Sequence, residues 1–448
     1  MTTDNDTLNL LSDLVTKAKR MGADAVDGVA VDATSTGVSW RDGKLEDVEG
    51  NEGSDIGLRV MIGKNQAIVS SSDRRPSALN DLITRVMDMV RAVPEDPYCG
   101  LADPACLFKG PLPDLELYDS SHISAEQLAE MASKMEDAMY TVKGVTNSAG
   151  AGASSGSWSM AMVTSDAFSG SYKGSSFSAS ISAIAGEGGG MERDYDFTSA
   201  RYFADLDDMA TIGKKAGNNV VKRLNPQRIE SGEMSVVFDP RVANSLLGHF
   251  AGAINGTSIA RGTSFLKDAM NRQVFPSDIN IIDDPLIVRG HKSRPFDGEG
   301  VKTTRQSLIE NGMLQQWALN SAAARQLGLT TTGHASRGTS SPPGIGMSNL
   351  YMAAGSKSPE ELMADIENGI YISELIGMGV NGVTGDYSRG AAGFIIKNGQ
   401  ISAPVNEITI ASNLKDMFKR MIVADDLVFK YGTNAPTVRI DGMMVASA

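Results

Sequence analysis

The chain has 448 residues, a formal net charge of −13 and a hydrophobic content of 41%. This length favours two or three domains over one small core, and the composition is that of a globular protein. The acidic balance and the absence of any run of basic residues argue against direct nucleic-acid binding, because phosphate contacts need clustered Lys and Arg.

The N-terminus carries neither a basic segment nor an apolar run, so no signal peptide is expected. No stretch approaches the roughly 20 apolar residues that a membrane helix needs. We therefore expect a cytoplasmic protein without membrane contact.

The first predicted elements are a helix and two hairpins. Apolar residues at helical spacing run from Leu8 to Ala18. Asp42-Gly43 separates two alternating runs and predicts a type I′ turn, which needs positive φ at both central residues. Stretch 58–69 predicts a second hairpin. A helix over about 77–93 and a Pro-rich connection follow, which gives an N-terminal α+β domain at 1–113.

The next segment predicts a central α+β domain at 114–230. Ser124 and Gln127 fit a capping box that opens a helix. Stretch 148–190 is rich in Ser, Gly and Ala, but its period of two favours strands over a flexible linker. A further helix is predicted over about 205–224.

The last segment, 231–448, predicts a β-rich domain with few helices. A short strand leads into Asp239-Pro240, which marks a helix start with proline at its first position. Three dipeptides predict hairpin turns: Asn311-Gly312, Asn398-Gly399 and Asp441-Gly442. The fold class is therefore α+β, with an N-terminal α/β part of antiparallel strands and helices before the β-rich domain.

The histidines argue against a complete catalytic metal site in this chain. The four are His122, His249, His291 and His334, and no two are spaced to supply a His-Glu-x-x-His helix. This chain would have to take any catalytic metal from another subunit, although ligands distant in sequence stay possible. His249 lies at the edge of an apolar helical stripe, which favours a half-buried imidazole with a backbone partner.

A polar quartet between glycines is the most informative short motif. Asp386, Tyr387, Ser388 and Arg389 stand side by side before a predicted strand. Glycines permit close backbone approach, so a loop at 385–390 can bind a main chain or a carboxylate. The alternative is a tight connection with an internal Asp–Arg ion pair.

The sequence resembles the TldD/PmbA family, and the resemblance is nearest to the PmbA branch, also called TldE. The stretches that carry it occur in the family's order: 191–196, 294–301, 332–334, 384–390 and 407–416. The resemblance implies a cytosolic zinc peptidase built from a TldD and a TldE subunit. It also implies roles in maturing peptides such as microcin precursors, in degrading unfolded or antitoxin polypeptides, and, by an older description, in modulating DNA gyrase.

The family's metal-bearing subunit has a His-Glu-x-x-x-His helix, and the matching positions here are degenerate. Asn244 stands at the first ligand, Ser245 at the general base, and only His249 survives. A neutral amide is a poor zinc ligand, and serine cannot replace a carboxylate as proton acceptor. The resemblance thus implies a non-metal subunit without a cofactor, paired with a zinc-bearing TldD-like partner and acting on unfolded peptides.

Other functions stay open from sequence alone. The chain can instead be a stand-alone regulatory or binding homodimer, or an independent metallopeptidase with unfamiliar ligands. The sequence leaves open whether the chain is itself an enzyme, and whether residues 385–390 contact the partner or the substrate.

Overall fold

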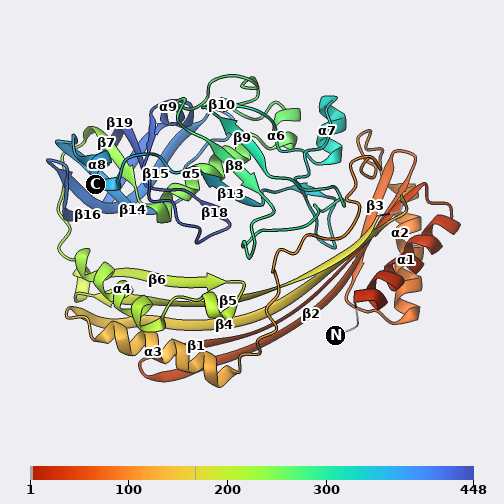
Figure 1. Ribbon diagram of the computed structural model, residues 1–448, viewed down its shortest axis with the longest axis horizontal. Helices are drawn as coiled ribbons and strands as arrows, with labels where there is room; N and C mark the ends of the chain where they lie inside the picture. Colours follow the sequence, from red (N-terminus) through yellow and green to blue (C-terminus); the bar gives the residue numbers. More distant parts are fainter. Residues whose placement is uncertain (1–3, 167, 448) are drawn as a thin grey trace.

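A long, curved antiparallel sheet forms the lower half of the molecule in Figure 1. The computed structural model describes residues 4–166 and 168–447. The sheet has the strand order β3-β2-β1-β4-β5-β6. Its strands are β1 (Ala25–Arg41), β2 (Lys44–Ile62), β3 (Asn65–Ser71), β4 (Val145–Thr164), β5 (Ser169–Ala185) and β6 (Glu192–Ala200). Both predicted N-terminal segments contribute to this one sheet, and the domain boundary near residue 113 stays a prediction.

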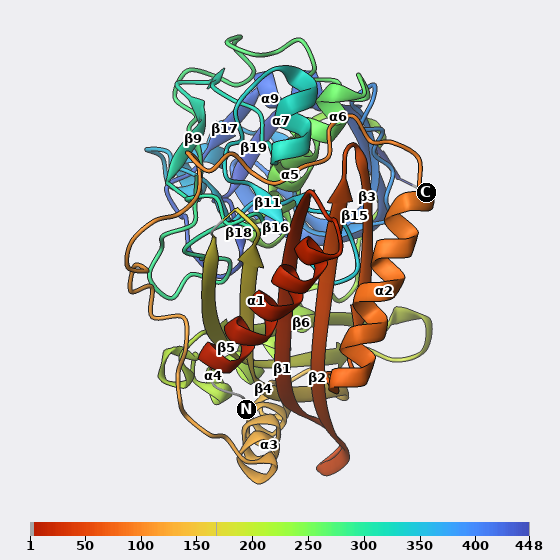
Figure 2. The same cartoon turned by 90° about the vertical axis from the view of Figure 1, so that its right-hand side faces the viewer.

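Two helix pairs cover one face of this sheet. They are α1 (Asp4–Arg20) with α2 (Pro76–Ala92), and α3 (Ala125–Tyr140) with α4 (Met209–Lys222). Figure 2 shows α1 and α2 lying over one end of the sheet. Val26 of β1 packs in the core under the first pair and Val38 in the core under the second. Alternate residues of a strand share a face, so both pairs lie on the same side. Val29, on the other face, packs in one cluster with Phe296, which belongs to the upper half of the molecule in Figure 1, here called the upper lobe.

The upper lobe contains a closed ring of strands. Its sheet has the order β16-β15-β14-β7-β19-β17, and an additional pairing of β16 with β19 closes it. The strands are β7 (Gly232–Phe238), β14 (Asn368–Ile376), β15 (Asp386–Lys397), β16 (Gln400–Asn413), β17 (Met421–Val423) and β19 (Val438–Ser447). The fold is therefore α+β, with a strand-rich C-terminal lobe, as the sequence predicts.

Smaller elements complete this lobe. A five-stranded sheet consists of β8 (Ile281–Asp284), β9 (Gln306–Glu310), β10 (Met313–Leu314), β13 (Asn349–Met352) and β18 (Thr433–Asn434), beside the pair β11 (Ala335–Ser336) and β12 (Gly344–Ile345). The helices of this lobe are α5 (Pro240–Ala253), α6 (Gly256–Ala260), α7 (Ser321–Leu327), α8 (Pro359–Met363) and α9 (Leu414–Lys419). The lower half of the molecule, the lower lobe, also contains two 3-10 turns, η1 (Gly188–Gly190) and η2 (Phe203–Asp205). Helix α5 contacts β14 of the ring and β13 and β18 of the second sheet, and its Phe250 is fully buried in the core.

Several local predictions are confirmed. Asp42 and Gly43 have φ of 51° and 73° in the turn between β1 and β2. Ser124 and Gln127 form both bonds of a capping box at α3.

Among the described residues, no helix is long and apolar enough to cross a membrane.

Two local predictions are wrong. Asp441 and Gly442 form a bulge inside β19, not a hairpin turn, because Ile440 pairs with Val236 and Met443 with Met234 of β7. The Ser235 hydroxyl of β7 donates to the Asp441 carboxylate at 2.6 Å. The second error concerns residues 386–390, which begin strand β15 rather than forming a loop.

Two helical glycines predict opposite changes in stability. A Cβ on Gly213 of α4 would lie 2.0 Å from the Met135 carbonyl oxygen of α3, whereas a Cβ on Gly248 of α5 meets nothing within 4 Å. We expect Gly213→Ala to lower the free energy of unfolding by about 1–3 kcal/mol. Gly248→Ala should raise it by about 0.5–1 kcal/mol, because alanine favours the helix. Urea denaturation measures both, and a Gly213→Ala chain as stable as the parent would contradict the close helix packing.

Candidate functional site

Helix α5 carries Asn244, Ser245 and His249, the three positions that the family resemblance relates to a metal motif. The Asp239 side chain caps its start by accepting from the Arg241 amide at 2.8 Å, and Pro240 occupies the first turn. The Ser245 hydroxyl donates to the Val242 carbonyl of the same helix at 2.7 Å. The Ser245 hydroxyl is therefore bonded to the backbone of its own helix. Asn244 and His249 lie on the same helix.

His249 meets Tyr387 across the interface between α5 and β15. Their ring centroids lie 5.9 Å apart with the planes at 80°. His249 is half-buried as predicted, but its Nε2 has no hydrogen-bond partner among the described residues, and neither has the Tyr387 hydroxyl. Two unpartnered polar atoms thus lie where α5 meets β15.

The surroundings of this pair disfavour charge on either ring. Burial lowers the pKa of the His249 imidazole, and the positive charge of Arg389 lowers it further. Burial raises the pKa of the Tyr387 phenol, and Arg389 only partly opposes that shift. Near neutral pH, the site therefore holds a neutral imidazole and a neutral phenol.

Asp386 and Ser388 point away from α5, whereas Arg389 lies on the same side of β15 as Tyr387. Tyr387 is 1% exposed, whereas Asp386 and Ser388 face solvent, as alternation along a strand requires. The Asp386 carboxylate accepts from Thr384 at 2.6 Å and from Asn413 at 3.1 Å, and these bonds lower its pKa. The Arg389 Nε donates to the Ile376 carbonyl at 3.3 Å. The alternative of an internal Asp386–Arg389 ion pair is therefore wrong.

These residues do not fit a zinc site. A catalytic zinc takes three protein ligands and keeps one position open. Across residues 4–166 and 168–447, no group of three or more His, Cys, Asp or Glu is placed to hold a metal ion. At the three motif positions only His249 offers a suitable atom, and these side chains support no metal-assisted step.

The connection between β14 and β15 forms an exposed apolar surface that the sequence did not predict. Ile376, Met378 and Val383 are 55%, 91% and 54% exposed. The Ser388 amide donates to the Gly379 carbonyl at 2.7 Å, which ties this connection to β15. Together with Asp386 and Arg389 these side chains form what we call the β14–β15 surface. In the sequence, this surface is indicated only by apolar residues that alternate with glycines over 376–385.

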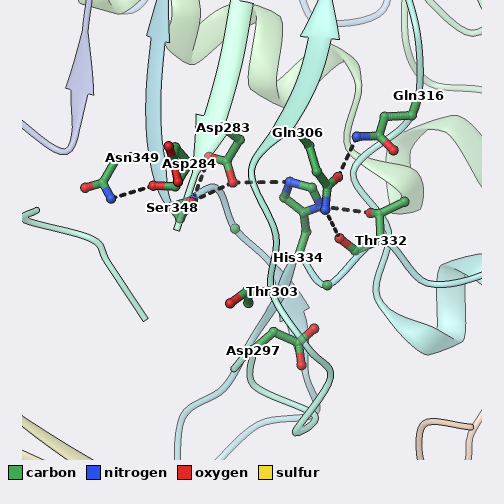
Figure 3. A network of polar contacts seen from close by, with 12 residues as sticks. Asp283, Asp284, Asp297, Thr303, Gln306, Gln316, Thr332, His334, Ser348 and Asn349 are labelled. Atoms are coloured by element: carbon green, nitrogen blue, oxygen red, sulfur yellow. Dashed lines mark hydrogen bonds and ion pairs between the residues drawn. The ribbon is translucent and has the colours of Figure 1, made fainter. Parts of the chain in front are cut away.

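His334, of one motif that carries the family resemblance, lies in a buried polar network with Thr332 and Asp283 (Figure 3). Asp297, of another such motif, accepts from the Ala335 amide at 2.9 Å. His334 is 1% exposed; its Nδ1 lies 2.8 Å from the Thr332 hydroxyl and its Nε2 lies 3.4 Å from Asp283. Burial, then repulsion from Glu299, raises the pKa of Asp297 to about 7. Both side chains are buried, and their hydrogen bonds and ion contacts join the loops that carry them.

Comparison with known proteins identifies the family. Models of the PmbA/TldA metallopeptidase match in three parts: domain 1 at 26–90, the central domain at 118–224 and the C-terminal domain at 231–447. The metalloprotease PmbA of Escherichia coli O157:H7 is 35% identical over 442 residues, covering 98% of this chain and 96% of that protein. The chain therefore belongs to the PmbA/TldD metallopeptidase family.

Solved structures share the whole fold. A Bacteroides thetaiotaomicron protein described as a candidate modulator of DNA gyrase has 26% identity and a TM-score of 0.92, with 100% of both chains covered. TldE from Thermococcus kodakarensis has 19% identity and a TM-score of 0.86, covering 98% of this chain and 100% of that one. The second likeness concerns the fold alone.

The unpartnered Tyr387 hydroxyl generates a prediction with an internal control. Tyr387→Phe removes a buried group that makes no bond, so the free energy of unfolding should stay constant or rise by up to about 1 kcal/mol. Tyr371→Phe removes a 2.8 Å bond to Asp239 and should lower it by about 1–3 kcal/mol. Chemical denaturation of both variants measures the difference. A loss of stability in Tyr387→Phe as large as that in Tyr371→Phe would mean that the hydroxyl has a partner.

Proposed function

We propose that this chain is the non-metal subunit of a cytoplasmic two-subunit metallopeptidase that acts on unfolded peptides. A TldD-like partner supplies the zinc, and this chain supplies a supporting surface beside the partner's active site. The observation that carries the proposal is helix α5, where His249 stands with Asn244 and Ser245 instead of a ligand set and a general base.

Family membership supports the peptidase part of the proposal. The full-length Escherichia coli relative is named a metalloprotease, and the Thermococcus structure is named TldE. The resemblance of the motifs implies that a TldE subunit works with a TldD subunit. A family member without its own ligand set then needs a partner that has one.

The β14–β15 surface suits such a partner. Met378 places a large apolar side chain almost wholly in solvent, and exposed apolar groups of this kind mark contact sites. Arg389 makes no ion pair among the described residues, so its guanidinium is available to a carboxylate or to main-chain carbonyls. Arg389 of this surface is close enough to His249 and Tyr387 to lower the pKa of each.

The first test separates this chain from its partner. We expect the purified chain to contain less than about 0.1 zinc per molecule and to cleave no peptide, because one imidazole cannot hold zinc tightly. Co-expression with a TldD-like homologue should yield a complex with zinc and peptide cleavage. Metal analysis and a peptide-cleavage assay measure both. Stoichiometric zinc in the isolated chain would refute the proposal.

The second test addresses Arg389. We expect Arg389→Ala to weaken partner binding or peptide turnover by about tenfold, the loss of one charge-assisted hydrogen bond. Arg85→Ala is the matched control, because Arg85 is an exposed arginine on α2, far from this surface in the fold. Wild-type assembly together with wild-type turnover in Arg389→Ala would remove the β14–β15 surface from the proposal.

The alternative of a stand-alone regulatory homodimer rests only on the description of the Bacteroides protein. Affinity capture from the native host distinguishes the two functions. Recovery of a zinc-bearing homologue supports the peptidase subunit, and recovery of gyrase without that homologue supports the regulatory module.

A further inference from the structure

A cavity of about 810 Å³ lies between the two lobes, away from His249. Strand β6 and helix α4 line one side, and the closed ring of the upper lobe lines the other; these elements face each other at the left of Figure 1. Pro240 and Arg241 of α5 also line it, at the end of that helix opposite His249. At about 1.5 Å per residue, eight residues separate Arg241 from His249 by about 12 Å.

The cavity has an aromatic wall. Tyr195 and Phe197 come from β6, Phe394 from β15, and Tyr431 from the segment before β18. The rings of Phe197 and Tyr431 lie 5.4 Å apart. A volume of this size with mainly apolar walls is typical of sites for small organic molecules or short peptide segments.

A buried hydroxyl without a partner faces this cavity. Ser373 is the extra residue of a β-bulge in β14, since Ile372 pairs with Gly393 and Glu374 with Ala392. Bulges re-aim side chains, and this one turns Ser373 into the cavity lining. The residue is 8% exposed, and its Oγ has no hydrogen-bond partner among the described residues. A buried hydroxyl left unpaired is unfavourable, and a polar ligand atom at this position would satisfy it.

The acidic side chains of the lining are already engaged with protein groups. Asp194 binds Arg223 and Arg241, Asp239 accepts from Tyr371, and Asp426 accepts from Thr437. Asp196 is held less tightly: Lys215 and Lys430 approach its carboxylate to 3.6 and 3.4 Å, and its Oδ2 has no hydrogen-bond partner among the described residues.

Helix α4 contributes cations to the lining. Lys215, Asn219 and Lys222 lie at i, i+4 and i+7 along α4, so they share one face. Lys222 is exposed and makes no ion pair among the described residues, and the Lys215 side chain is 57% exposed. Cations at the rim and aromatic rings within suit an anion with an apolar body.

We propose that this cavity binds an apolar side chain next to a free carboxylate, the chemistry shared by the C-terminal end of a peptide and a free apolar amino acid. The apolar side chain lies against Tyr195, Phe197 and Tyr431. The carboxylate meets the lysines of α4, and Ser373 bonds to a polar atom of the ligand. This site needs no metal and no partner subunit, so it stands independently of the proposed function.

Calorimetric titration of the full chain tests the site with three probes: the tripeptide Ala-Ala-Phe, its C-terminal amide and free phenylalanine. We expect the tripeptide to bind with a Kd below about 1 mM and the amide to bind at least about tenfold more weakly, because the amide lacks the charge. Free phenylalanine as tight as the tripeptide identifies an amino-acid site, and a tighter tripeptide identifies a peptide-end site.

Two lysines of α4 provide the matched variants. Lys222→Ala should weaken tripeptide binding by about three- to tenfold, whereas Lys214→Ala, an exposed neighbour outside the cavity lining, should leave it unchanged. Both side chains are exposed, so folding should be unaffected. Ser373→Ala should also weaken binding without lowering the unfolding temperature. Equal binding of the acid and the amide, no binding of any probe at about 5 mM, or equal effects of the two lysine variants would overturn the proposal.

Discussion

The Asp27 carboxylate is buried between two arginines and joins the lower sheet to the upper lobe. Both candidate sites lie in or between these two parts. Asp27 of β1 pairs with Arg59 of β2 and with Arg337 of the upper lobe, and all three side chains are at most 4% exposed. Glu299 supplies a second negative charge nearby. Removing one member of such a buried set leaves a charge without its partner, which costs about 3–5 kcal/mol. This cluster therefore ties the lower sheet to the upper lobe.

Helix α5 connects the two candidate sites. At its start Arg241 binds Asp194 of the lower sheet, and toward its end His249 meets Tyr387. Between them Leu246 and Phe250 are almost fully buried in the main core. Packing alone is thus sufficient to hold this helix in place, so its position does not depend on a metal ion.

The sequence correctly predicted turns and helix caps that depend only on residues close together in the chain. The turn at Asp42-Gly43 and the capping box at Ser124 need only local contacts, and both are present. Asp441-Gly442 has the same turn signature, yet it forms a bulge, because its partner strand β7 lies some two hundred residues earlier. The meeting of His249 with Tyr387 and the turning of Ser373 into a cavity likewise depend on pairings between distant segments. Nothing in a local pattern encodes them.

Closure of the ring has a consequence for folding. Strand β19 pairs with β7, β17 and β16, so one segment near the end of the chain satisfies the backbone of three others. Until residues 438–447 are synthesised, β7 and β16 expose unpaired edges that can recruit strands of other molecules. The pairing of β19 with β7 also joins segments that lie far apart in the sequence, and contacts between distant segments slow folding. We therefore expect the nascent chain to be most prone to aggregation just before its last strand emerges, and to need chaperones then.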